Sequence, residues 1–227
     1  MRRAGLAPVS GMLAVVLAGL VAPLGAAGQE LADLDYEYLG FRGFGFDWGY
    51  LWPTNVEKTG SIGLRIDMGY AGPGLRILPH VSYWSSALER GDITALEDRI
   101  EDLIAAQSGA PSPQLDLGTI EKRDIAVGVD AQVVWDSLLD LLTYGGLGVT
   151  AHIVDGDGTA IAGTFIDDLL DSVGAGFNLH FGMEYPVTER MRIYGLSKYE
   201  VMSDMQFFTA RVGWQIMTGP NAPGEGR

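Results

Sequence analysis

The chain has 227 residues, with 15 basic and 29 acidic side chains and a formal net charge of −14. This length suits one domain or one closed barrel, and the acidic balance excludes a protein built to bind nucleic acid phosphates. There is no cysteine, which excludes disulfides and thiolate metal sites.

The first segment, residues 1–28, is predicted to be a signal peptide. Arg2 and Arg3 precede the apolar run 11–24, and small residues follow it near Ala27 and Gly28. Because this run is short for a helix crossing about 30 Å of hydrocarbon, a membrane anchor is the weaker interpretation. The remaining chain has 13 basic and 29 acidic residues, a net charge of −16. No later segment has about 18 unbroken apolar residues, so a membrane location would require strands.

Eight later segments alternate apolar and polar side chains, as strands with two different faces do. The first of them, GFGFDWGYLW, puts five aromatic side chains on one face and mainly glycine and aspartate on the other. In the second, Tyr70 continues the apolar face that begins at Ile62. The predicted strands are 43–52, 61–71, 75–85, 123–134, 142–154, 176–186, 191–201 and 208–216.

The connections between these strands alternate between short and longer segments. Tight turns are predicted at 72–74, 135–137 and 186–190, and longer loops at 54–60, 87–119, 155–172 and 202–205. This asymmetry is typical of outer-membrane barrels, whose turns are periplasmic and whose loops are extracellular. The expected fold is all-β, an eight-stranded antiparallel transmembrane β-barrel over residues 36–217, followed by a disordered tail, 218–227.

The two faces of the strands indicate lipid outside and a crowded polar lumen inside. The polar face is rich in glycine and carries charges of both signs, whereas the apolar face is nearly continuous. Asp47 is expected to pair with Arg65 or Arg211. The predicted luminal charges are Asp47, Arg65, Asp67, Asp130, Glu184, Lys198 and Arg211. The aromatic residues predicted at the two lipid interfaces are Tyr50, Trp52, Tyr83, Trp135, Tyr185 and Trp214.

Three stretches carry a family resemblance: TYGGLGVTAHI, GFNLHFGMEYPVTERMRIY and SKYE. They resemble the second half of the small OmpA/OmpX-type outer-membrane β-barrel family, a porin-family type of barrel domain. The resemblance covers most of the chain after residue 28 and implies the barrel fold more than a particular activity. Lys198 stands where the family often has arginine, and Leu196 where an acidic partner is common.

Two stretches suggest chemistry, and a structural interpretation is favoured for each. His80 and Ser82 share a face and could form the core of a lipid-modifying enzyme, but both are predicted to point into the lumen. His152 and His180 also point inward, without the spacing of a metal site, so no catalytic residue, metal or cofactor is expected. The run DGDGTAIAGTFID resembles a fragment of a calcium loop but lacks its key glycine and glutamate, which favours a simple turn.

Helices are expected in two of the loops. Thr94 and Glu97 form a capping box that begins a helix ending at Gly109. Its apolar stripe is Leu96, Ile100, Leu103 and Ile104. A second short helix is expected over 164–170. The two loops are expected to pack on each other, and a surface partner through the 87–119 loop is the alternative.

The favoured function is that of a monomeric, integral outer-membrane barrel with a structural or surface-interaction role and no enzymatic activity. Its partners would be outer-membrane lipids and not nucleic acid, in a cell envelope of Gram-negative type. A small channel or transporter for tiny or apolar solutes is the first alternative. A lipid-modifying enzyme using His80 and Ser82 is the second, and a soluble ligand-binding barrel is the third.

Overall fold

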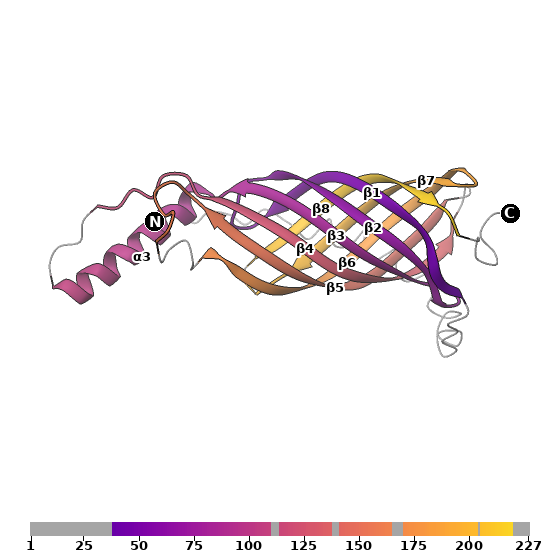
Figure 1. Cartoon of the computed structure of the whole chain (residues 1–227), viewed down its shortest axis with the longest axis horizontal. Coiled ribbons are helices and arrows are strands. Elements are labelled where there is room, and N and C mark those ends of the chain that lie inside the picture. Colours follow the sequence, from indigo (N-terminus) through magenta and orange to yellow (C-terminus); the bar gives the residue numbers. More distant parts are fainter. Residues whose placement is uncertain (1–37, 110–113, 138–140, 165–169, 204, 220–227) are drawn as a thin grey trace, which may run out of the picture.

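The computed structural model describes residues 38–109, 114–137, 141–164, 170–203 and 205–219. Eight antiparallel strands form one closed barrel, in which each strand pairs with its neighbours in sequence and the first pairs with the last (Figure 1). The predicted fold class is therefore confirmed. The strands are β1 Leu39–Pro53, β2 Thr59–Gly72, β3 Leu75–Ala87, β4 Glu121–Asp136, β5 Leu142–Asp157, β6 Ser172–Thr188, β7 Met191–Val201 and β8 Gln206–Met217.

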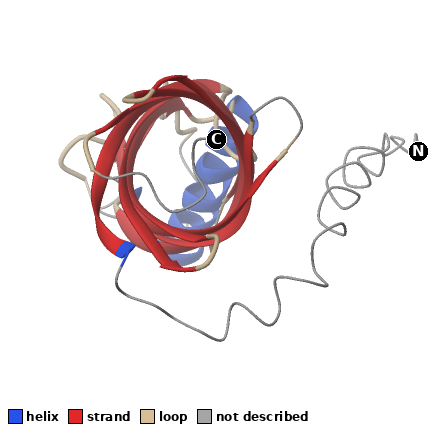
Figure 2. Ribbon diagram, turned by 90° about the vertical axis from the view of Figure 1, so that its right-hand side faces the viewer, coloured by secondary structure: helices blue, strands red, loops and turns tan. Residues whose placement is uncertain are grey.

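The one helix with bounds in the described chain, α3 (Arg90–Ser108), lies between β3 and β4. Figure 1 shows it projecting from the end of the barrel where the longer connections gather, which we call the loop end; the tight turns form the turn end. Figure 2 views the closed ring of strands along its axis, with α3 beyond the far end. No helix in the described part of the chain is long and apolar enough to cross a membrane.

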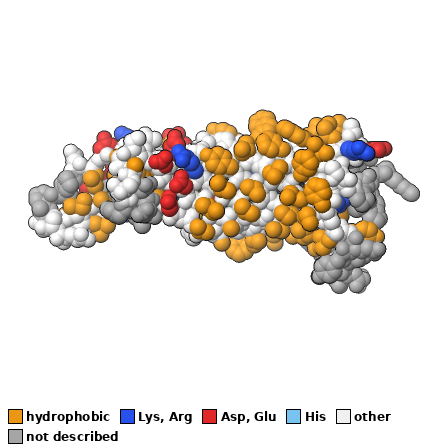
Figure 3. Space-filling view, in the orientation of Figure 1, with side chains coloured by type: hydrophobic (Ala, Val, Ile, Leu, Met, Phe, Trp, Pro, Cys, Tyr) orange, Lys and Arg blue, Asp and Glu red, His pale blue; other side chains and the backbone are white. Residues whose placement is uncertain are grey.

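Period-two alternation separates the two faces of the barrel wall. Side chains such as Trp48, Val149 and Phe177 point outward and are 57%, 54% and 70% exposed, whereas the polar residues between them are buried inside. Exposed large apolar side chains occur on all eight strands, and they cover the barrel between charged groups at its two ends (Figure 3). Such an unbroken apolar belt is what a barrel wall surrounded by lipid requires.

The alternation shifts near the turn end of β2, and this corrects the predicted place of Tyr70. Tyr70 is buried and points inward, with the Arg42 guanidinium carbon 5.2 Å from its ring centroid. The β2–β3 pairing is irregular between Arg65 and Tyr70. Gly69 has φ of 76°, and its N–H donates to the Asp67 carboxylate at 2.8 Å. This bulge inserts one residue into β2 and turns the following side chain to the other face.

Two predicted turns and one helix start also differ from the structure. Trp135 still pairs with Thr143, so β4 continues through Asp136 instead of turning at 135–137. Strand β6 runs through Thr188, which shortens the turn predicted at 186–190. Helix α3 begins four residues before Thr94, after Glu89, and no side chain caps that end. Thr94 instead donates to the backbone oxygen of Arg90.

Some predicted segments lie outside the described residues. These are the signal peptide, most of the second loop helix at 164–170 and the tail beyond residue 219. Of the tail, Thr218 and Gly219 donate their backbone N–H groups to Arg42, at 2.7 and 2.9 Å. The segment predicted as a tail, 218–227, therefore begins with two residues that are hydrogen-bonded to β1.

The orientation of the wall leads to a depth-dependent prediction. Val149→Arg, in the middle of β5, should destabilise the folded barrel by about 2–4 kcal/mol, because a charge there faces the bilayer midplane. Val173→Arg, at the loop-end start of β6, should cost only about 0–1 kcal/mol. Urea unfolding of the barrel in lipid vesicles, followed by tryptophan fluorescence, measures both. Equal small costs at the two depths would contradict a lipid-facing exterior.

Candidate functional site

The lumen is filled by a balanced set of buried charges. In the described chain, twelve charged residues are less than 9% exposed there, six basic and six acidic. They include all seven predicted luminal charges, together with five that the prediction omitted. The twelve are Arg42, Asp47, Arg65, Asp67, Arg76, Asp124, Asp130, Glu184, Arg192, Lys198, Glu200 and Arg211.

Glycines on the luminal face provide the room for these long side chains. A Cβ on Gly148 would overlap the Asp130 carboxylate, and one on Gly63 would lie 2.7 Å from an Arg211 guanidinium nitrogen. An eight-stranded barrel is just wide enough for its interior to be filled by side chains. Glycine on one strand therefore makes space for a charged group that reaches across from another.

Glu184 on β6 is the centre of the charge network toward the turn end. Its carboxylate accepts from Arg76 at 2.6 and 3.0 Å and from Arg65 at 2.7 Å, and Arg192 lies 3.4 Å away. Glu184 and Arg76 are both fully buried. One carboxylate thus links β2, β3, β6 and β7 across the lumen. Charge-assisted hydrogen bonds of this kind are the strong ones in a low-dielectric interior.

Asp47 on β1 makes a second cluster at mid-barrel. It accepts from Arg211 at 3.3 Å and from the Tyr194 hydroxyl at 2.8 Å. The expected contact with Arg65 is not among its hydrogen bonds and ion pairs. Arg65 instead binds Glu184 and Gln215, and its guanidinium carbon lies 3.3 Å from the Tyr194 ring centroid. Of the two predicted partners, the structure brings only Arg211 to Asp47.

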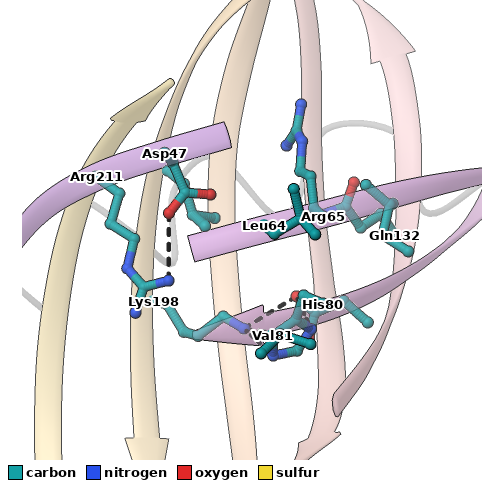
Figure 4. Close-up of a pocket in the computed structure, with 11 residues that line it drawn as sticks. Asp47, Leu64, Arg65, His80, Val81, Gln132, Lys198 and Arg211 are labelled. Atoms are coloured by element: carbon teal, nitrogen blue, oxygen red, sulfur yellow. Dashed lines mark hydrogen bonds and ion pairs between the residues drawn. The ribbon is translucent and has the colours of Figure 1, made fainter. Parts of the chain in front are cut away.

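Asp130 on β4 makes the third cluster. Its carboxylate accepts from Lys198 at 3.0 Å and from the Asn178 amide at 3.0 Å. His80 lies beside both groups, with its Nε2 3.2 Å from Lys198 Nζ and its Nδ1 3.6 Å from Asp130 Oδ2. A cavity of about 20 Å³ lies between this cluster and the Asp47 cluster, which is room for about one water molecule. Figure 4 shows the Asp47–Arg211 pair and Lys198 on its border.

His152 on β5 joins two carboxylates nearer the loop end. Its Nδ1 lies 2.9 Å from Asp124 and its Nε2 lies 3.1 Å from Glu200, while Trp84 donates its indole N–H to Asp124 at 2.9 Å. Asp67, the remaining predicted charge, accepts from Gln215 at 3.0 Å and lies 3.7 Å from Arg76. From the Glu184 cluster near the turn end to His152 nearer the loop end, hydrogen bonds or ion pairs therefore cross the lumen.

The loop end of the lumen is closed by apolar side chains, which the polar-lumen prediction did not anticipate. A buried cluster there consists of Leu51, Val56, Trp84, Val154, Met202, Met205 and Phe207. We call it the apolar plug. A second cluster above it, which we call the loop core, consists of Ile93, Ile100, Leu117, Ile120 and Ile161, with Leu88, Leu96, Leu115 and Leu170 at its edge.

The loop core joins the two long loops, as the preferred interpretation of the sequence expected. Ile161 comes from the β5–β6 connection and packs with Ile93 and Ile100 of α3. Only part of the predicted apolar stripe of the helix is buried, since Leu103 is 59% exposed and Ile104 is 36% exposed. Ile100 is the last residue of α3 in the loop core, and the helix extends two turns beyond it.

Two glutamates of α3 act inside the loop instead of on its solvent face. Glu97 accepts the backbone N–H of Leu117 at 2.8 Å, and Glu101 accepts that of Leu115 at 2.7 Å. These bonds attach the chain that returns to β4 along one side of the helix. In the sequence, Glu97 and Glu101 are spaced i, i+4. The same spacing is typical of a solvent-exposed helix face, so it does not by itself predict these bonds.

The predicted interface aromatics lie on the outside of the barrel, near its ends. Tyr50, Trp52 and Tyr83 are exposed toward the loop end, whereas Tyr185 and Trp214 are exposed toward the turn end. Trp135 is half-buried, with its ring centroid 6.3 Å from that of Phe181. Trp52 also packs on Phe208, and Phe46 packs on Trp214, so β1 and β8 share an aromatic surface.

The arrangement around His80 and Ser82 favours structural packing. Both side chains are largely buried inside the barrel, and His80 makes polar contacts with Lys198 and Asp130. Asp130 Oδ2 is 3.6 Å from His80 Nδ1, beyond hydrogen-bond distance. Among the residues that the structure describes, no group of three or more His, Asp or Glu side chains is placed to hold a metal ion.

Comparison with known proteins was made by sequence and by structure. The sequence matches no protein-family model, and no curated protein sequence matches it. Neisserial surface protein A superposes on it with a TM-score of 0.51 and 12% identity, over 78% of this chain and 97% of that one. The chain has the fold of the small outer-membrane β-barrels. At the level of fold, this confirms the OmpA/OmpX-type resemblance.

Two further outer-membrane barrels superpose less closely. Ail of Yersinia pestis gives a TM-score of 0.47 at 10% identity, over 79% of this chain and 99% of that one. The N-terminal barrel domain of Pseudomonas aeruginosa OprF gives 0.41 at 9% identity, over 77% and 97%.

Proposed function

We propose that the protein is exported through a cleaved signal peptide, residues 1–28, and resides in the outer membrane as a monomer. There it serves a structural or surface-interaction role. The observation that carries this proposal is the combination of an apolar outer belt with a closed lumen. The lumen is crossed by the Glu184, Asp47 and Asp130 clusters and is closed by the apolar plug.

A filled lumen supports a non-conducting barrel. A cavity among the described luminal residues has a volume of about 20 Å³ and is bordered by ion-paired side chains. An ion crossing the barrel would have to separate buried charge pairs, which costs several kcal/mol for each. Planar bilayers containing the folded protein are therefore expected to show no resolved conductance steps. Reproducible steps, absent from bilayers without protein, would favour the channel alternative.

The same geometry supports a protein without enzymatic activity. His80 contacts Lys198 inside the barrel, where the lipid headgroups of the membrane do not reach. The lipid A mass spectrum of cells that express the protein is expected to match that of cells lacking it. It should also be unchanged by His80→Ala. A protein-dependent change in lipid A that disappears in this variant would establish the lipid-modifying alternative.

The surface role is assigned to the loop end, through the 87–119 loop. Among the described residues, helix α3 is the longest element outside the barrel wall, and the loop core holds it in place. A fixed element costs less ordering entropy on binding than a disordered loop does. Protease accessibility on intact cells tests its exposure: cleavage within residues 87–119 from outside supports the proposal, and cleavage only after lysis contradicts it.

A further inference from the structure

The pairing of strands in the barrel wall is interrupted between β2 and β3. These strands pair in register as far as Arg65 and His80, and pair again at Tyr70. In the two described segments between these pairs, 66–69 of β2 and 77–79 of β3, no residue has a register partner across the seam. We call these two segments the interrupted seam. By contrast, β4 and β5 pair without a break along their whole length.

The residues of the interrupted seam give the physical reason for the break. Pro79 of β3 has no backbone N–H, so it cannot donate to a neighbouring strand. On β2, Gly69 has φ of 76° and donates its N–H to the Asp67 carboxylate at 2.8 Å. Backbone groups without partners are costly in a bilayer, where no water replaces the missing bonds. The interrupted seam is therefore a weak line in the wall.

Charged side chains join β2 and β3 on the luminal side of this seam. Asp67 of β2 lies 3.7 Å from Arg76 of β3. The Glu184 carboxylate of β6 accepts from Arg65 of β2 at 2.7 Å and from Arg76 at 2.6 Å, so one group holds both strands. We call Arg65, Asp67, Arg76 and Glu184 the latch. Through its side chains, the latch connects two strands where the backbone does not.

The interrupted seam lies between the luminal cavity and the lipid. The cavity of about 20 Å³ is lined in part by residues of these two strands, namely Leu64, Arg65, Leu78, His80 and Val81 (Figure 4). On the outer face, the side chains over the seam are apolar and half-buried: Ile66, Met68, Ile77 and Pro79. Separation of the two strands at this place would join the cavity to the interior of the bilayer.

We propose that the β2–β3 seam is a latched lateral opening, which connects the luminal cavity with the surrounding bilayer when the latch is released. Segments with few backbone hydrogen bonds are the ones that open locally in a folded protein. The apolar plug keeps the loop end closed, so opening sideways adds no conducting path along the barrel axis. This inference goes beyond the proposed structural role, because it gives the wall a second state.

The test measures cysteine reactivity in the full barrel, folded into phosphatidylcholine vesicles. The chain has no cysteine of its own, so Leu78→Cys introduces a single thiol on the luminal side of the interrupted seam. Thr150→Cys is the matched control, because Thr150 is also buried in the lumen but lies on the uninterrupted β4–β5 seam. An apolar, bilayer-soluble maleimide should label Leu78→Cys about tenfold faster, because a buried thiol reacts only from locally opened states.

Release of the latch should act on this seam and not on the whole barrel. Adding Glu184→Gln should raise the labelling rate of Leu78→Cys about tenfold further and change that of Thr150→Cys less than about twofold. Glu121→Gln, which removes an exposed carboxylate at the barrel rim, should change neither rate. A charged, water-soluble maleimide should label Leu78→Cys slowly in every variant, because the opening faces lipid.

Three results would overturn the lateral opening: equal labelling of the two cysteines, equal acceleration of both by Glu184→Gln, or faster labelling by the charged reagent. The first comparison leaves the latch intact, so it decides the proposal even if Glu184→Gln does not reach the folded gel mobility of the wild type. A barrel that resides in the outer membrane but labels equally at both positions contradicts the lateral opening alone. A protein found outside the outer membrane contradicts the proposed function itself.

Discussion

Glu184→Gln is expected to destabilise the folded barrel by about 3–5 kcal/mol, because it leaves buried arginines without their counter-charge. The Glu184 carboxylate is the acceptor for Arg65 and Arg76, at 2.7 and 2.6 Å, and all three side chains are at most 5% exposed. Glutamine keeps the size of the side chain but removes its charge. The substitution therefore tests the electrostatic contribution more than the packing.

The measurement is the free energy of unfolding in urea, with the protein folded into lipid vesicles and tryptophan fluorescence as the signal. Glu121→Gln is the matched control, because Glu121 also pairs with an arginine, Arg123, but both side chains are about half exposed. The control should change the free energy by less than about 1 kcal/mol. If Glu184→Gln cost no more than Glu121→Gln, the luminal network would not be a source of stability.

Gly182→Ala is expected to impair folding strongly, although it adds only one methyl group to the wall. A Cβ on Gly182 would overlap both the Tyr144 hydroxyl and the backbone oxygen of Gly195 on the neighbouring strand. Tyr144 is fully buried, and its hydroxyl donates to that same Gly195 oxygen at 3.2 Å. Because a backbone atom cannot move aside without breaking the strand pairing, the cost should exceed the usual range of about 1–3 kcal/mol for overpacking.

Gly195→Ala provides the control on the facing strand, since a Cβ there would meet nothing within 4 Å. Folding yield is measured by gel mobility without boiling, after refolding from urea into vesicles. Gly182→Ala should refold poorly or not at all, whereas Gly195→Ala should match the wild type. Equal yields for the two variants would show that the luminal glycines are not needed to make space.

The wall of the barrel was predictable from sequence because it depends on local alternation. A side chain that alternates with apolar neighbours must face the other way along a strand, so the burial of Asp130 or Lys198 follows from position alone. Consecutive antiparallel pairing of all eight strands also followed, because alternating short turns and longer loops are typical of outer-membrane barrels. The place of Tyr70 did not follow. In the sequence, Tyr70 continues the apolar side of the alternation. Only the bulge at Gly69 turns the Tyr70 side chain from the outer face to the luminal face.

The partners of the luminal charges were harder to predict, because alternation shows which face a side chain is on but not its position along the barrel axis. Arg65 and Glu184 are 119 positions apart in sequence, and Arg76 and Glu184 are 108 apart. Arg76 was not among the predicted luminal charges. It proves to be the most buried arginine of the Glu184 cluster. The sequence feature that could have indicated this contact is the position of Arg76 beside the tight turn after β2. That position places Arg76 near the turn end of the barrel, where Glu184 also lies.

The loop end was predicted in outline and not in detail. The apolar stripe of α3 indicated burial, but it could not show that Leu103 and Ile104 extend beyond the loop core. The Thr94 and Glu97 pattern suggested a helix start, although the contacts of Leu88 and Glu89 with neighbouring loops allow the helix to begin at Arg90. Tertiary contacts therefore override the local capping signal at this end.

The most direct test of the central claim, a closed barrel in the outer membrane, is heat-dependent gel mobility of fractionated cell envelopes. The protein should be found in the outer-membrane fraction. Unboiled samples should show a band at a different position from boiled samples, because the closed hydrogen-bonded sheet resists detergent until heated. A protein recovered entirely from the soluble periplasmic fraction, with one mobility before and after boiling, would contradict both the location and the lipid-facing exterior.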